Sequence, residues 1–239
     1  MYYSKEKIQK NNDFNKLLQS IITLRSEFNS KLYLPNQAVK FAKSFNHPVI
    51  LADVQDNPGA GAASDNIEIL EALISLKVES SLVGMINNPE VAKIAHKIGV
   101  GGKFRAKIGS KFNPDYTSLE CNFKVISLSD GKFTFKGKMY KGIKANSGMT
   151  ACLSIDNCSN IHIVISSVRC QALDKAVFTH LGLNLNNYKI IVLKSTVHFI
   201  DDFQSFSKTI INVKTDGLAT CDLRDITFKN LNKNIETNL

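Results

Sequence analysis

The stretch Ile50-Leu-Ala-Asp53-Val-Gln-Asp56-Asn57-Pro58-Gly59-Ala-Gly61-Ala-Ala-Ser64-Asp65-Asn66 decides the fold expected for this chain. The apolar run 48–52 predicts a buried strand that ends in a carboxylate, and a loop with one Pro and two Gly follows. Apolar residues at helical spacing then predict a helix from about Asn66 to Leu76, with Ser64 or Asp65 as its cap. A strand, a glycine loop and a helix N-terminus in this order are typical of a ligand site in an α/β protein.

The residues of this loop support two interpretations. Gly59 and Gly61 would let the backbone turn sharply and approach a ligand, while Asp53 and Asp56 would supply charge or oxygen ligands. In the other interpretation the loop is structural and its Asp side chains only cap turns. The pattern alone leaves both open, because a glycine-rich loop by itself is a weak signal.

The rest of the chain extends the α/β pattern, with one change of character in the middle. Period-2 alternation predicts a β-rich insertion, whereas strands and helices alternate before and after it. We therefore expect α/β architecture with a mainly parallel, three-layer sheet core in a single domain over residues 1–239. Its expected parts are N-terminal helices (1–46), the α/β core (47–100 and 166–225), the β-rich subdomain (101–165) and a tail (226–239).

Local signals place some boundaries within this plan. Asn88-Pro89 predicts the start of a helix that Gly99 ends. Ser129-Asp130-Gly131-Lys132 predicts a hairpin turn, and an apolar run predicts a strand over 188–193.

Composition excludes several classes of protein. The 239 residues are 44% hydrophobic, but no run approaches the roughly 20 apolar residues that span a bilayer. Because the N-terminus also lacks the apolar core of a signal peptide, we expect no membrane and a cytoplasmic location. The net charge of +9 comes mostly from lysines that look scattered, without an RNA-binding or helix-turn-helix motif, so we expect no nucleic-acid partner.

A second candidate site follows the strand predicted over 188–193. Lys194, Ser195 and His198 would lie at its carboxyl end, where α/β proteins place ligands. Lys194 could neutralise an anion, and His198 could donate a hydrogen bond or transfer a proton. Alternatively, Lys194 and Ser195 cap the next helix and His198 only packs.

Arg169 and Gln171 follow another predicted strand. The planar guanidinium suits a carboxylate, either of a substrate or of Asp174, and a purely structural ion pair explains it equally well. Because parallel strands end at one edge of a sheet, we also expect Asp53, Asp56 and His198 to lie close together.

No metal site is expected within this chain. The five histidines stand alone in the sequence, without a His-Glu-x-x-His pattern, and Asp53 and Asp56 are the only plausible local pair of ligands.

Three blocks of the sequence resemble the MlrC (microcystinase C) family of metallopeptidases. The segment 53–65 is similar to the family's Asp-x-x-Asp-Asn-Pro-Gly-x-Gly-x-x-x-Asp signature, and 189–199 to its Val-Lys-Ser-x-x-His-Phe-Arg element. A weaker match is 165–174, to Ser-x-Arg-x-Gln-x-x-Asp. Ile200 stands where the family has Arg, so any guanidinium contact there is lost.

The resemblance implies a set of site residues. His198 and Lys194 would be catalytic. Substrate would be bound by residues from the three blocks: Asp53, Asp56, Asn57, Gly59, Gly61, Asp65, Arg169, Gln171 and Ser195.

The resemblance also implies what this chain needs from elsewhere. The family hydrolyses small linear or modified peptides with a zinc ion held in a separate N-terminal domain, which we expect this chain to lack. The chain would thus be the C-terminal part or a split subunit of such an enzyme, and it would be inactive alone. Its partner would be a separate chain that carries the N-terminal zinc domain, or a second copy of itself. The alternatives are a non-catalytic α/β module that binds a small anion at the glycine loop and Lys194, and an inactive relic.

Overall fold

A computed structural model describes residues 7–28, 30–109, 117–232 and 234–235 of the chain. They belong to two compact units, 32–221 and the two terminal segments 1–31 and 222–239. The larger unit contains both candidate sites. Its strands are β1 (Val49–Asp53), β2 (Ser81–Asn87), β3 (Lys103–Gly109), β4 (Ser118–Ser129), β5 (Lys132–Thr134), β6 (Lys144–Asn146), β7 (Thr150–Ile155), β8 (Cys158–Ser166), β9 (Ile190–Leu193) and β10 (Thr209–Val213).

The helices of the larger unit lie between these strands in the chain. They are α2 (Pro35–Lys43), α3 (Glu68–Ser75), α4 (Pro89–Ile98), α5 (Ala176–Thr179) and α6 (Ile200–Phe203), with 3₁₀ turns η2 (Pro58–Ala60) and η3 (Leu185–Asn187). The terminal segments form α1 (Lys7–Thr23) and the 3₁₀ turns η1 (Arg25–Phe28) and η4 (Leu223–Asp225).

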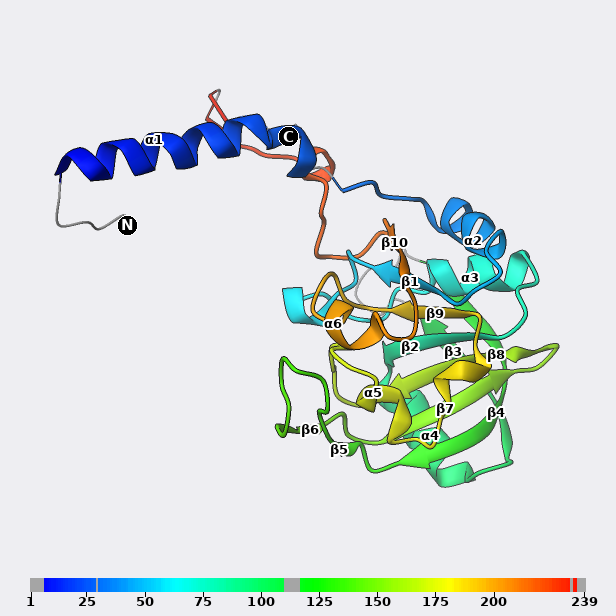
Figure 1. Cartoon of the computed structure of the whole chain (residues 1–239). Helices are drawn as coiled ribbons and strands as arrows, with labels where there is room; N and C mark the ends of the chain where they lie inside the picture. The colour runs from blue at the N-terminus through cyan, green and yellow to red at the C-terminus, as the bar shows by residue number, and fades with distance from the viewer. Residues whose placement is uncertain (1–6, 29, 110–116, 233, 236–239) are drawn as a thin grey trace. The chain divides into compact units, whose positions relative to one another are not determined.

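Eight strands form one sheet in the order β10-β1-β9-β2-β8-β7-β4-β3 (Figure 1). The pairs from β10 to β8 are parallel, and the pairs from β8 to β3 are antiparallel. This confirms the α/β class and the mainly parallel core. The β-rich stretch 101–165 adds β3, β4, β7 and most of β8 to the same sheet, and only β5 and β6 form a sheet of their own.

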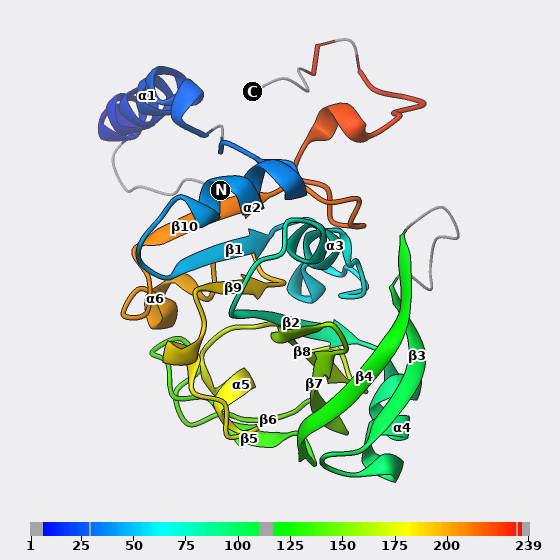
Figure 2. The same cartoon turned by 90° about the vertical axis from the view of Figure 1, so that its right-hand side faces the viewer.

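Alternating side chains divide the core into two layers, one on each face of the sheet. Val49 and Leu51 of β1 pack with α2, α3 and α4, whereas Ile50 and Ala52 pack with α5, α6 and Phe135. β9 divides its side chains in the same way. Because a strand buried on both faces must be apolar throughout, the continuous apolar runs of β1 and β9 are what this three-layer fold requires. Figure 2 shows the helices on either side of the sheet.

Two local predictions are confirmed and two are wrong. The Asn88 side chain accepts from Val91 N at 3.1 Å, and Gly99 ends α4 with φ of 84°. Ser64 and Asp65 do not cap α3, because Asn66 Oδ1 accepts from Glu68 N instead. The segment 129–132 does turn, but it is no hairpin, since β4 pairs with β3 and β7 while β5 pairs with β6.

The smaller unit contains α1, whose apolar side chains from Phe14 to Ile22 are exposed. Leu17 and Ile21 are 56% and 49% exposed, and Phe28 just after the helix is 58% exposed. Among the described residues, no helix is long and apolar enough to cross a membrane.

Candidate functional site

The candidate site has a buried inner part at the carboxyl edge of the parallel strands. The Lys194 side chain, 2% exposed, follows β9 and donates to Asp53 Oδ2 at 2.9 Å and to Asp56 Oδ2 at 2.7 Å. Its third hydrogen bond goes to the Asn66 carbonyl at 2.7 Å. All three ammonium protons therefore have acceptors within the protein. We call Asp53, Asp56 and Lys194 the buried triad.

Both carboxylates of the buried triad are also fixed by other groups. Asp56 accepts from the backbone N–H groups of Ser64 and Asn66 at 2.7 and 2.8 Å. Asp53 accepts from Thr215 Oγ1 at 2.6 Å and from Asp56 N at 3.3 Å. These bonds close the glycine loop onto itself and join the ends of β1, β9 and β10. The buried triad thus holds the loop in one shape.

Burial and charge act against each other in the triad. Burial and the neighbouring Asp56 carboxylate raise the pKa of Asp53, and Lys194 opposes that rise. Burial alone would lower the pKa of Lys194, but the Asp53 and Asp56 carboxylates outweigh it and raise that pKa well above the ordinary value for lysine. The raised pKa of Lys194 favours its charged form near neutral pH, where all three of its protons are donated within the protein.

The outer part of the site, which we call the Gln171 bridge, consists of the half-buried Gln171, the buried Ser195 and the exposed His198. Gln171 Nε2 donates to Ser195 Oγ at 3.0 Å and lies 3.1 Å from His198 Nδ1. The Gln171 side chain also covers Gly59, where an added Cβ would stand 2.1 Å from Gln171 Oε1. A residue other than glycine at 59 would displace the glutamine, which is a physical reason for glycine there.

Further contacts join the glycine loop to the loop after β9. Asn57 accepts from Gly59 N at 2.8 Å and donates to Thr196 Oγ1 at 3.0 Å. Arg169 is exposed and donates to the Ala62 carbonyl at 3.3 Å. The predicted approach of the two loops is thus confirmed. Lys194, Gln171 and the Asn57–Thr196 hydrogen bond link the Asp53–Asp65 segment to the loop containing His198.

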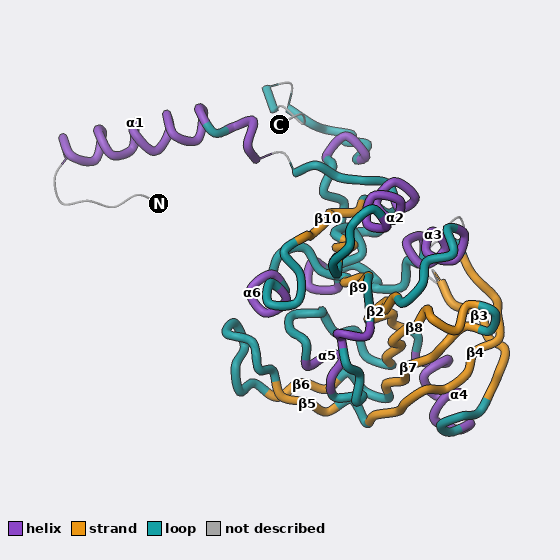
Figure 3. The backbone as a smooth tube through the Cα atoms, turned by 45° about the vertical axis from the view of Figure 1, so that its right-hand side comes forward, coloured by secondary structure: helices purple, strands orange, loops and turns teal. Residues whose placement is uncertain are grey.

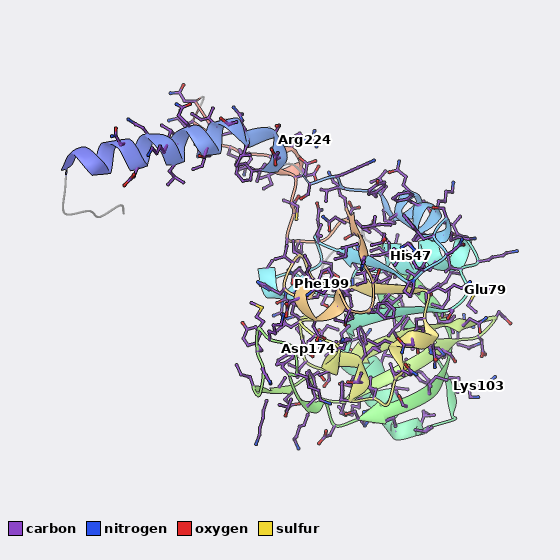
Figure 4. All side chains as sticks on the ribbon, in the orientation of Figure 1. His47, Glu79, Lys103, Asp174, Phe199 and Arg224 are labelled. Atoms are coloured by element: carbon purple, nitrogen blue, oxygen red, sulfur yellow. The ribbon has the colours of Figure 1, made fainter. Side chains whose placement is uncertain are left out.

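The other predicted site residues are distributed between the two parts. Asp65 is 5% exposed, whereas Gly59 and Gly61 are at the exposed tip of the loop. Among the described residues Arg169 makes no ion pair with Asp174. Asp174 (labelled in Figure 4) instead accepts from the backbone N–H groups of Lys136 and Gly137 at 2.7 and 2.8 Å, and from Ala176 N at 2.7 Å.

His198 borders an open hollow of about 570 Å³ on the outer side of the bridge. The hollow is lined by Lys138, Met139, Val197, His198, Ile200, Asp201 and Gln204. Lys138 Nζ and Asp201 Oδ1 form an exposed ion pair of 3.0 Å across it. His198 Nδ1 faces Gln171, so its Nε2 is the ring nitrogen without a protein partner among the described residues.

The residues of the site do not fit a zinc ion. Across the described ranges, no three His, Cys, Asp or Glu side chains converge as metal ligands. The two carboxylates nearest to such a role, Asp53 and Asp56, are already occupied by Lys194 and by N–H and O–H donors. A divalent cation would have to displace the lysine from a fully buried position.

Sequence reasoning missed several residues that hold the site. Thr215 and the Asn66 carbonyl bond directly to the buried triad, and Ser64 adopts φ of 62° within the loop. Ser64 Oγ donates to the Met85 carbonyl at 2.7 Å. No local pattern indicates these contacts, because each depends on chain segments that meet only in the folded protein.

Comparison with known proteins identifies the class of this domain. The chain belongs to the family described as the MlrC C-terminus, whose model matches residues 51–230 and therefore includes both loops of the site. It is a metallopeptidase-like family.

Two relatives illustrate the similarity. The chain is 26% identical to Microcystinase C from Sphingomonas sp. over 168 residues, which are 70% of this chain and 32% of that protein. A crystal structure of a candidate metallopeptidase from Mesorhizobium sp. BNC1 superposes with a TM-score of 0.74 at 22% identity, covering 85% of this chain and 40% of that one. The chain thus spans about a third of the length of the curated relative, and the structural likeness shows a shared fold.

Proposed function

We propose that this chain forms the C-terminal, substrate-facing part of an MlrC-like metallopeptidase that hydrolyses small linear peptides. The observation that carries the proposal is the Gln171 bridge. Gln171 joins the glycine loop at Gly59 to Ser195 and His198 of the loop after β9, so that three chain segments meet beside an open hollow that His198 borders. All of these segments lie within the region that the family model matches.

The two parts of the site have different roles in this proposal. The buried triad holds the glycine loop and the loop after β9 in register, and it does not touch substrate. The Gln171 bridge faces the peptide, and His198 uses its Nε2 to donate a hydrogen bond or a proton to it. Lys194 leaves the set of catalytic candidates on physical grounds, because its three donors are used within the protein.

Metal ligands come from polypeptide outside this sequence in the proposal. A zinc ion supplies a Lewis acid and an activated water when it is bound. The residues of the Gln171 bridge bind and orient the peptide. The proposal also includes a binding partner. Either a chain or domain that carries the metal ligands, or a second copy of this chain, would bury exposed apolar surface such as that of α1.

The anion-binding alternative loses its main donor in the structure. It requires the Lys194 ammonium to face a ligand at the glycine loop, but that ammonium is buried between two carboxylates. No observation favours this alternative over the peptide-binding proposal.

The first test is where a peptide binds on the isolated chain. We expect small linear peptides to shift the NMR signals of Gly59, Gln171 and His198, and His198→Ala to weaken binding about threefold to tenfold. His47→Ala is the matched control, because His47 is another exposed histidine but precedes β1 and bonds Thr209 at the opposite edge of the sheet. Binding that leaves these signals unchanged, or that His47→Ala weakens equally, would overturn the proposal.

The second test is chemical. The isolated chain should bind no stoichiometric zinc in equilibrium dialysis and should not cleave peptides. Adding a zinc-loaded N-terminal region from a longer MlrC relative should restore cleavage, and His198→Ala should reduce it. Stoichiometric, chelator-sensitive zinc on the isolated chain would instead indicate an independent metalloenzyme.

A further inference from the structure

The excursion from Asp130 to Asn146 concentrates positive charge in a short segment. This segment, which we call the lysine arm, contains β5, β6 and the loop between them, and has five lysines against one aspartate. Lys132 pairs with Asp130 and Lys138 with Asp201. The other three, exposed and without a carboxylate within ion-pair distance among the described residues, are Lys136, Lys141 and Lys144. The lysines of this chain are therefore not all scattered, because these five lie within one short segment.

The base of the lysine arm is held firmly against the rest of the unit. Phe135 is 7% exposed and packs into the core layer formed by α5 and α6. Asp174 accepts from the N–H groups of Lys136 and Gly137, and a Cβ on Gly137 would stand 3.0 Å from the Asp174 Cβ. Figure 3 shows β5 and β6 beside α5. The lysines thus project from a fixed base.

The arm reaches the candidate site. Lys138 and Met139, in the middle of its loop, line the same hollow as Val197 and His198. A second hollow of about 400 Å³ has Lys136 and Lys175 in its lining. Lys138 is paired with Asp201, but the unpaired Lys136 and Lys141 lie two residues away in the chain from Lys138 and Met139, which line the hollow. Ammonium groups near a site raise the local concentration of anionic ligands and speed their association, within a screening length of about 8–10 Å.

We propose that the lysine arm makes the site prefer peptides that carry free carboxylates. This inference rests on the proposed function and names the substrate class for it. A peptide fits better than a nucleic acid because the hollow beside His198 has the size of a small-ligand site, which is about 300–1,000 Å³.

The test compares two peptides on two charge-matched variants. A fluorescent linear peptide with two Glu and its isosteric Gln version are titrated by anisotropy at low and high salt. The arm variant is K136Q/K141Q/K144Q. The control is K40Q/K93Q/K97Q, which removes the same charge from exposed positions on α2 and α4, the helices of the opposite core layer.

We expect the wild-type chain to bind the Glu peptide about five- to tenfold more tightly than the Gln peptide at low salt. The arm variant should lose most of this preference, and the control should keep it. High salt should reduce the preference of the wild type and of the control. If the thermal unfolding midpoints of the two variants equal that of the wild type, neither variant is misfolded.

Three results would overturn the inference. They are equal binding of the two peptides by the wild type, equal loss of preference in both variants, and tighter binding of a single-stranded RNA than of the Glu peptide. If His198-dependent peptide cleavage is reconstituted but shows no preference for acidic peptides, this inference fails and the proposed function stands. If no peptide shifts the Gln171 bridge, both fail.

Discussion

The buried triad and the Gln171 bridge come from the same loops but differ in almost every physical respect. Lys194 is enclosed by three acceptors, whereas His198, four residues later, is exposed and contacts one flexible glutamine. Burying two carboxylates and one ammonium is costly, and removal of one partner leaves charge without compensation. The exposed groups carry no such penalty. The comparison teaches that of the two residues expected to be catalytic, Lys194 is buried among its protein partners, whereas His198 faces solvent.

The largest expected effect is the loss of stability when the buried triad loses its cation. Lys194→Met should lower the free energy of unfolding by about 3–5 kcal/mol, because Asp53 and Asp56 stay buried without their cation. Urea unfolding followed by circular dichroism measures the loss. Lys138→Met is the matched control. Its partner Asp201 is 41% exposed, so that change should cost less than about 1 kcal/mol. Equal effects of the two substitutions would refute the assignment of the buried triad as the scaffold.

High pH should weaken the ion pairs between Lys194 and the two carboxylates of the buried triad. Although burial opposes it, the two carboxylates raise the pKa of Lys194 above that of an unfolded lysine, about 10.4. The stabilisation from this raised pKa is complete below that value and is lost as the pH rises through the folded-state pKa. The stability difference between the wild type and Lys194→Met should therefore stay constant up to about pH 10 and then shrink. Urea unfolding at stepped pH measures it. A constant difference into the alkaline range would mean that the two carboxylates do not raise the pKa of Lys194.

The next effect concerns the base of the lysine arm. Asp174→Ala removes the acceptor for three backbone N–H groups and should cost about 2–4 kcal/mol. Hydrogen exchange should accelerate at Lys136 and Gly137. Asp174→Asn keeps a single amide oxygen and should fall between the wild type and the alanine variant. Unchanged exchange in Asp174→Ala would show that the arm is held by its apolar contacts alone.

The sequence predicts the fold better than it predicts the contacts and burial of the site residues. The apolar strands β1 and β9 are recognisable because a strand that is covered on both faces must be apolar throughout. Their carboxyl ends follow from parallel pairing, which is why the approach of the two loops is predicted correctly. The β-rich stretch is also recognised, but alternation cannot show that its strands continue the main sheet.

What the sequence could not show depends on contacts between distant segments. Ser64 and Asp65 look like caps, yet Ser64 turns into the left-handed region and its hydroxyl donates to the Met85 carbonyl. The first N–H of α3, that of Glu68, donates to the Asn66 side chain instead. Likewise, Thr215 joins the buried triad from 162 positions beyond Asp53. The burial of Lys194 is also invisible in sequence, since the same residue followed by Ser and Thr is common at exposed loops.

The smallest expected effect concerns the contact between Gly59 and the Gln171 side chain in the Gln171 bridge. Gly59→Ala should cost about 1 kcal/mol, because its Cβ would stand 2.1 Å from Gln171 Oε1 and push the side chain away from Ser195 and His198. In a Gln171→Ala background the same change should cost almost nothing, because the obstructing atoms are gone. A double-mutant cycle by urea unfolding measures this coupling.

Gly61→Ala supplies the contrast for that cycle. A Cβ at Gly61 meets nothing within 4 Å, but its φ of 92° disfavours any side chain. Its cost should therefore be the same with or without Gln171. If Gly59→Ala behaves like Gly61→Ala, the glutamine does not rest on the loop in solution and the Gln171 bridge is not a fixed surface. If only Gly59 is coupled to Gln171, the loop tip, the glutamine and His198 form one unit, and a peptide that displaces any of them must move all three.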